Sequence, residues 1–181
     1  KFHHKLNIYS DTTYYFITTD LGTGKRIATQ NSSALIPTHT VTSFDDYVFH
    51  ESEAVNLLKS GRQWLGETFD IISSYNFTFT FPNIETSSEV YAKVDAGARA
   101  NDPGTNFSWN AGNASSSFTV PSVNTSGIYD TYYRIYADTL NFYPSSGNIP
   151  VTISKTTSSP AIGWLNYIEV NAKRQLTMNG S

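Results

Sequence analysis

Strict alternation of aromatic and polar residues in one stretch is the feature that most restricts the fold of this chain. The run 75–81 reads Tyr-Asn-Phe-Thr-Phe-Thr-Phe, with every second residue aromatic. Successive side chains of a β-strand point to opposite faces, so the run predicts a strand with one face against a core and the other toward solvent. Further runs rich in aromatic and β-branched residues follow at 90–98, 106–109, 117–120, 132–140, 151–154 and 164–170. Their spacing of roughly ten to fifteen residues is close to the rhythm of sandwiches and barrels.

Turn residues separate these runs, as at 101–104 and 144–148, where Gly, Pro, Asn and Ser gather. We therefore predict an all-β fold, a jelly-roll-like, galactose-binding-like β-sandwich over residues 51–181. Residues 1–50 are predicted to be an N-terminal strand or hairpin segment, with hairpin strands at 14–19 and 26–29. This segment either packs on the sandwich or belongs to a preceding domain. One short helix is predicted at 52–60, because Ser52 can cap a stretch with suitably spaced apolar residues.

Composition argues against several function classes. The chain of 181 residues has no Cys, a net charge of −3 and only 15% charged residues. A basic surface for nucleic acid is therefore not expected, and a thiol nucleophile and thiolate metal ligands are excluded. The four His residues lack the spacing of a helical zinc pair, and no Gly-x-Ser-x-Gly elbow occurs. No apolar run approaches the roughly 18 residues of a spanning helix, so we expect neither a signal peptide nor a membrane anchor. We predict no cofactor, metal or catalytic residue, although carboxylates from distant loops leave calcium open.

The run 56–67 fits neither a regular strand nor a regular helix. Two apolar pairs are interrupted by glycines, and Arg62 and Glu67 flank Trp64. In one interpretation Arg62, Trp64 and Glu67 form a docking surface, with Trp64 as the anchor and Arg62 as a planar donor. In the other, which we favour, the run is a structural corner in which Trp64 is buried and Arg62 pairs with Glu67.

The same run carries a resemblance to a known family. Ser-Gly-Arg-Gln-Trp-Leu-Gly-Glu at 60–67, followed by Phe-Thr-Phe-Thr-Phe-Pro-Asn at 77–83, resembles the region upstream of the peptidase domain in PorU-like sortases of the type IX secretion system. Further similar stretches occur in the same order at 11–16, 24–27 and 165–176. The family more often has Glu where this chain has Gln63, and Phe or Tyr where it has Leu65.

The resemblance implies a part of a larger enzyme. These sortases are gingipain-like cysteine peptidases at the outer membrane and cell surface of Gram-negative bacteria, and they remove C-terminal signal domains from secreted cargo. Because this chain has no Cys, no catalytic residue of the family can be transferred to it. The resemblance thus implies a non-catalytic accessory domain. Its expected partners are the peptidase domain of the parent chain and other secretion-system or cargo proteins, without membrane insertion of its own.

A carbohydrate-binding module of a secreted surface protein is the alternative function. Aromatic residues make up 14% of the chain, and sandwiches of this kind often stack sugars on exposed rings, which makes Trp64, Trp109 and Trp164 the candidates. Packing in the core is the favoured role for each of them, since Trp is heavily buried on average. The exposure of the three side chains distinguishes the two functions.

Overall fold

The computed structural model describes residues 1–3, 5, 12, 14–31, 33, 35–59, 63–157 and 160–177. The chain divides into two units, one of residues 1–4 and 42–181 and the other of residues 5–41. Throughout the described residues the regular secondary structure is β-strand, without a helix. The predicted all-β class is confirmed. Within the same residues, no helix is long and apolar enough to cross a membrane.

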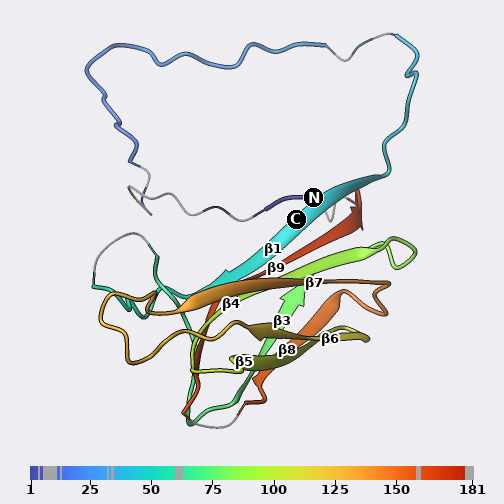
Figure 1. Ribbon diagram of the computed structural model, residues 1–181. Helices are drawn as coiled ribbons and strands as arrows, with labels where there is room; N and C mark the ends of the chain where they lie inside the picture. The colour runs from blue at the N-terminus through green and yellow to red at the C-terminus, as the bar shows by residue number, and fades with distance from the viewer. Residues whose placement is uncertain are drawn as a thin grey trace. The chain divides into compact units, whose positions relative to one another are not determined.

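The larger unit is a sandwich of two antiparallel sheets, drawn as two layers in Figure 1. The larger sheet has the order β1-β9-β4-β7, and a short β2 pairs with one end of β9. The smaller sheet has the order β3-β8-β5-β6. The strands are β1 (Ser43–Glu51), β2 (Thr68–Phe69), β3 (Ser74–Thr80), β4 (Val90–Arg99), β5 (Thr105–Ala111), β6 (Ala114–Val120), β7 (Arg134–Phe142), β8 (Asn148–Lys155) and β9 (Ile162–Gln175).

The connections are those of a jelly roll. Leaving β2 aside, the chain passes from one sheet to the other at every connection except the β5–β6 hairpin. The first and last strands are neighbours: β1 pairs with β9 in continuous register from Ser43, opposite Gln175, to Glu51, opposite Tyr167. Two four-stranded sheets linked in this way make a double-sheet jelly roll. The predicted jelly-roll-like sandwich is therefore confirmed.

Small side chains of one sheet face large ones of the other in the core. On β4 the inward residues include Ala92, Val94 and Ala96, all fully buried. Phe107 on β5 is also fully buried and meets Phe69 edge to face, with 5.3 Å between ring centroids. Edge-to-face aromatic pairs stabilise a core beyond the area that they bury. The residues that alternate in the sequence thus face the core and the solvent in turn.

Two of the three Trp residues belong to this core. Trp109 is 2% exposed and Trp164 is 5% exposed. The indole N–H of Trp109 on β5 donates to Oδ2 of Asp138 on β7 at 2.8 Å, so it joins the two sheets. The favoured role in core packing is confirmed for both side chains.

The helix predicted at 52–60 is wrong for the residues described there. Val55 instead pairs with Leu65 as an isolated antiparallel bridge, and each backbone N–H donates to the other's carbonyl at 2.8 Å. Lys59 has a positive φ of 51°, which a helix does not contain. Pairing with a distant segment has overridden the local spacing of the apolar residues. Ser60 and Gly61 lie outside the described residues.

The predicted N-terminal segment also differs from the structure. Part of the range 1–50 forms β1 of the larger sheet, so the sheet begins at Ser43. In the unit of residues 5–41, no strand occurs among the described residues, including those of the predicted hairpin at 14–19 and 26–29. Phe16 there is 99% exposed, and its neighbours Tyr14, Tyr15 and Ile17 are also exposed. Without a buried face, these side chains gain nothing from the strand conformation that their residue types favour.

Candidate docking surfaces

A tightly held corner precedes β2. Leu65 is buried and pairs with Val55, while the backbone N–H of Gly66 donates to the carbonyl of Leu165 on β9 at 2.7 Å. A Cβ added to Gly66 would lie 2.9 Å from both the Cβ and the carbonyl oxygen of Ser52. Only glycine therefore fits this close approach. The corner fixes the directions of the side chains on either side of it.

Trp64 is partly exposed to solvent at this corner. Its side chain is 40% exposed, so the predicted burial of Trp64 is wrong, and the neighbouring Leu65 takes the interior position. Extended residues alternate between the two sides of the chain, so only one of these two neighbours can face the core. The result is an exposed, positioned aromatic ring, whereas Trp109 and Trp164 are covered.

Glu67, three residues beyond Trp64, pairs with a side chain of β1. His50 Nε2 lies 2.8 Å from Glu67 Oε1. Burial of Glu67 would raise the pKa of its carboxyl, but the hydrogen bonds from His50 and from its own backbone N–H, with the charge of His50, outweigh burial and hold the pKa below 4.5. Oε2 of Glu67 has no hydrogen-bond partner among the described residues. Arg62, its predicted partner, lies outside them.

A second surface lies on the outer face of the larger sheet. Ile168 and Val170 on β9 point into the core, so Glu169 and Asn171 between and beyond them point outward. Glu169 is nevertheless 0% exposed. We call Tyr47 on β1, Tyr91 on β4 and these two polar residues of β9 the outer strip. Residues Lys1, Phe2 and His3 lie over it.

Phe2 is held through both its backbone and its ring. Its backbone N–H donates to Asn171 Oδ1 at 2.6 Å, and Asn171 Nδ2 donates to the carbonyl oxygen of Phe2 at 3.1 Å. The Phe2 ring stacks on Tyr47 with 5.3 Å between centroids. One amide side chain thus binds the N–H and the C=O of a single residue, as a neighbouring strand would.

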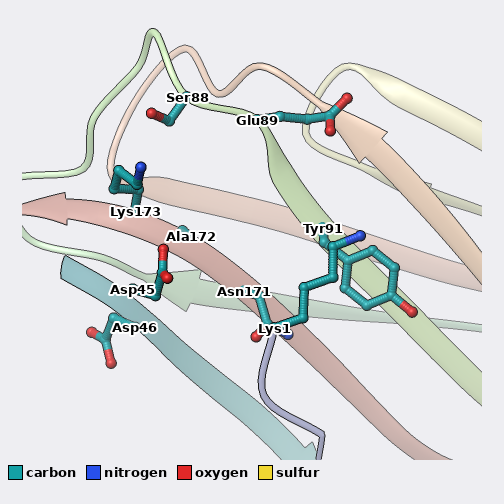
Figure 2. A pocket seen from close by; sticks show the side chains of 9 residues that line it. All are labelled: Lys1, Asp45, Asp46, Ser88, Glu89, Tyr91, Asn171, Ala172 and Lys173. Atoms are coloured by element: carbon teal, nitrogen blue, oxygen red, sulfur yellow. The ribbon is translucent and has the colours of Figure 1, made fainter.

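Lys1 and His3 place their polar groups on either side of Phe2. His3 Nδ1 lies 2.9 Å from Glu169 Oε1, so the outward carboxylate has a partner in this segment. The Lys1 ammonium lies 4.0 Å from the centroid of the Tyr91 ring, within range of a cation–π contact. Figure 2 shows the Lys1 side chain extending beside this ring.

An acidic hollow of about 340 Å³ continues the outer strip beyond Lys1. Asp45 and Asp46 on β1 line the hollow together with Glu89, which precedes β4 (Figure 2). The ammonium group of Lys173 on β9 also lines it. Asp46 Oδ2 also lies 2.7 Å from Arg174 Nη1. The hollow is open, and its three carboxylates exceed the two ammonium groups of Lys1 and Lys173, so it can accept one further basic side chain.

A polar network lies farther along the same face. Lys93 Nζ on β4 donates to the Tyr167 hydroxyl on β9 at 2.6 Å, and Asn166 Nδ2 donates to Asp95 Oδ1 at 3.0 Å. Burial raises the pKa of Asp95 above 3.8, and the bond from Asn166 and the charge of Lys93 offset this only in part. Burial also raises the pKa of Tyr167. The outer face of the larger sheet therefore holds titratable groups in desolvated positions.

Sequence reasoning missed the outer strip. Its one signal is that Glu169 and Asn171 alternate with the apolar Ile168, Val170 and Ala172, and this pattern by itself indicates only ordinary alternation between core and solvent. The first residues of the chain lie over these positions through long-range contacts, which no local sequence pattern predicts. Arg62, Trp64 and Glu67 were proposed because two glycines interrupt the run that contains them.

The outer face of the smaller sheet has a shallow groove of about 470 Å³. Apart from the buried Trp109 beneath it, the groove is lined by Ser108, Asn110, Ser115, Ser116, Ser117 and Ser154. Across the residues that the structure describes, no three His, Cys, Asp or Glu side chains come together to hold a metal ion. The groove offers hydroxyl and amide groups without charge.

Comparison with solved structures finds the same fold in dimeric latent PorU from Porphyromonas gingivalis. The TM-score is 0.61 at 19% sequence identity, over 78% of this chain and 14% of the PorU chain. This chain thus spans about a seventh of the length of that protein. The functional form of the mosquito-larvicidal Cry4Aa toxin from Bacillus thuringiensis matches with a TM-score of 0.40 and 13% identity, over 60% of this chain and 19% of the toxin chain. No family model and no curated protein sequence matches the chain.

Proposed function

We propose that this chain is a non-catalytic accessory β-sandwich domain of a PorU-like sortase, a cell-surface cysteine endopeptidase that removes C-terminal signal domains from secreted cargo. The supporting observation is that one fold covers most of this chain and a small part of the PorU chain. A sandwich of this size within a much longer protein fits a domain that positions another part of that protein. The chain has no Cys to serve as the nucleophile of such a peptidase.

The proposed docking surface is the corner with Trp64, Glu67 and Arg62. An exposed Trp on a backbone fixed by Gly66 is already ordered before a partner arrives, so little conformational entropy is lost on binding. Aromatic and Arg residues also supply a large share of the binding energy in protein interfaces. The proposed partners are the peptidase domain of the parent chain and other secretion-system or cargo proteins, at the outer membrane and cell surface of a Gram-negative bacterium.

Binding to the rest of a PorU-like parent protein tests this proposal. Trp64→Ala should weaken binding by about 30-fold or more if Trp64 is an interface anchor, as losses near 2 kcal/mol are typical of such residues. Tyr129→Ala is the matched control, because Tyr129 is an exposed aromatic residue outside the corner. Circular dichroism confirms the fold of each variant. Wild-type affinity in the Trp64 variant would remove the corner from the proposal, and no binding by the wild type would contradict the accessory role.

Carbohydrate binding is the second candidate, and the groove on the smaller sheet favours it. Serine hydroxyls and the Asn110 amide suit the hydroxyl groups of a sugar, although the buried Trp109 offers no ring for stacking. Affinity electrophoresis on glycan gels measures this function directly. Retardation that Asn110→Ala and Ser117→Ala abolish would support sugar binding, and unchanged migration on all gels would contradict it.

A further inference from the structure

We propose that the outer strip is a binding site for an extended peptide segment from another chain, carrying a basic, an aromatic and then an imidazole side chain. Lys1, Phe2 and His3 occupy this site in the structure and show the chemistry that it accepts. The inference goes beyond the docking corner and does not depend on it. Trp64 is absent from the contacts of the strip.

Backbone binding by Asn171 provides the first argument. Its side-chain amide accepts from the N–H of Phe2 and donates to the C=O of the same residue. This pairing needs only an extended backbone, so it accepts residues of many types at the central position. Asn171 is 7% exposed with Phe2 paired to it, so its amide lies beneath the segment that it binds.

Side-chain binding provides the second argument. Glu169 is a buried carboxylate on the outer face, and a buried charge costs stability unless a partner compensates it. His3 is such a partner at 2.9 Å and comes from the occupying segment. Tyr47 stacks on the aromatic ring and Tyr91 lies beneath the ammonium group. The strip therefore selects an order of side chains, with the cation before and the imidazole after the aromatic residue.

The acidic hollow provides the third argument. It opens beside Lys1 and contributes Asp45 and Glu89 where a segment longer than Lys1–His3 would continue. A second basic residue on the incoming peptide would meet these carboxylates. The strip and the hollow together thus extend farther than the three residues that occupy them.

Competition between the chain's own segment and a peptide in trans tests the inference. The double variant Phe2→Ala/His3→Ala removes the side chains of the occupant. A fluorescein-labelled peptide Gly-Lys-Phe-His-Gly is titrated into the 181-residue protein and followed by anisotropy. We expect the double variant to bind it about tenfold or more tightly than the wild type, because a tethered segment competes at an effective concentration in the millimolar range.

Matched variants assign the binding to the strip. Asn171→Ala in the double variant should weaken binding about tenfold, as expected for two lost hydrogen bonds, whereas Asn110→Ala on the smaller sheet should leave it unchanged. Replacing Phe or His in the peptide by Ala should also weaken binding, and this comparison does not depend on the folding of any variant. Equal affinity of the wild type and the double variant, no binding by either, or no effect of changing the peptide would each overturn the inference.

Discussion

The outer faces of the two sheets differ in chemistry although they share one core. The larger sheet shows Tyr91, Lys93, Asp95, Tyr167 and Glu169, all of them titratable. The smaller sheet shows uncharged residues only along its four strands. They are Ser74, Asn76, Thr78 and Thr80 of β3, Asn106, Ser108 and Asn110 of β5, Ser115, Ser117 and Thr119 of β6, and Asn148, Pro150, Thr152 and Ser154 of β8.

The buried apolar residues determine the fold, whereas the outward residues, which differ between the two sheets, are available for function. Both sheets bury apolar residues at every second position, and that is enough to define the sandwich. On the smaller sheet, hydroxyl and amide groups bond across strands, as Ser154 does to Ser74 at 2.8 Å, and remain exposed to water. On the larger sheet, charged groups are desolvated, which costs stability unless specific partners are present. Contacts with specific partners are therefore expected on the larger sheet.

Removing a core side chain that contacts both sheets should destabilise both of them together. Phe107→Ala deletes a fully buried ring that contacts Phe69 from the other sheet, and such deletions cost about 3–5 kcal/mol. Urea denaturation measures the loss as a lower midpoint. A loss of less than about 1 kcal/mol would mean that the two sheets do not depend on this contact.

Weakening the link between the sheets should have a smaller effect. Trp109→Phe keeps most of the ring but removes the indole N–H that donates to Asp138 at 2.8 Å. Hydrogen bonds to charged groups contribute about 1.5–3 kcal/mol, and we expect a loss within that range. The double-mutant cycle with Asp138→Ala isolates the pair, and additive single effects would show that the bond contributes nothing.

The titratable face should make stability depend on pH through Asp95. Its pKa in the folded protein lies above 3.8, so its contribution to the free energy of unfolding is fully present below pH 3.8 and is lost as pH rises through the folded pKa. Asp95→Asn should thus gain stability relative to the wild type between about pH 3 and pH 7. Thermal unfolding of both proteins across this range gives the difference curve. A flat difference curve would contradict the burial of this carboxyl.

The uncharged face should tolerate substitution best. Ser154→Ala removes one exposed hydroxyl and its bond to Ser74, and surface changes of this kind usually stay within about 0.5 kcal/mol. Differential scanning calorimetry should place its melting temperature close to that of the wild type. A large shift would show that the hydroxyl rows of the smaller sheet carry stability as the charged groups of the larger sheet do.

The sandwich could be predicted because the alternation of apolar and polar residues within each strand is visible in the sequence. Alternation at 75–81 indicated β3, observed at Ser74–Thr80, and the run at 90–98 indicated β4, observed at Val90–Arg99. The helix at 52–60 could not be rejected, since its replacement by the Val55–Leu65 bridge depends on a later segment. The contact of Glu169 with His3 joins residues 166 apart in sequence. Local patterns determine which residues face inward, but they do not reveal what covers an outward face.

The adjacency of the first and last strands has a mechanical consequence. The backbone N–H of Leu176 donates to the carbonyl of Thr42 at 2.8 Å, so the chain enters and leaves the sandwich side by side. Antiparallel ladder bonds run perpendicular to the strands, so a force applied between these two positions acts along them. The hydrogen bonds of the β1–β9 ladder would break one after another. They would not be loaded in parallel, as they are when two strands are pulled apart in shear. Tension between the flanking segments would therefore detach β1 first and expose the edge of β9 at low force.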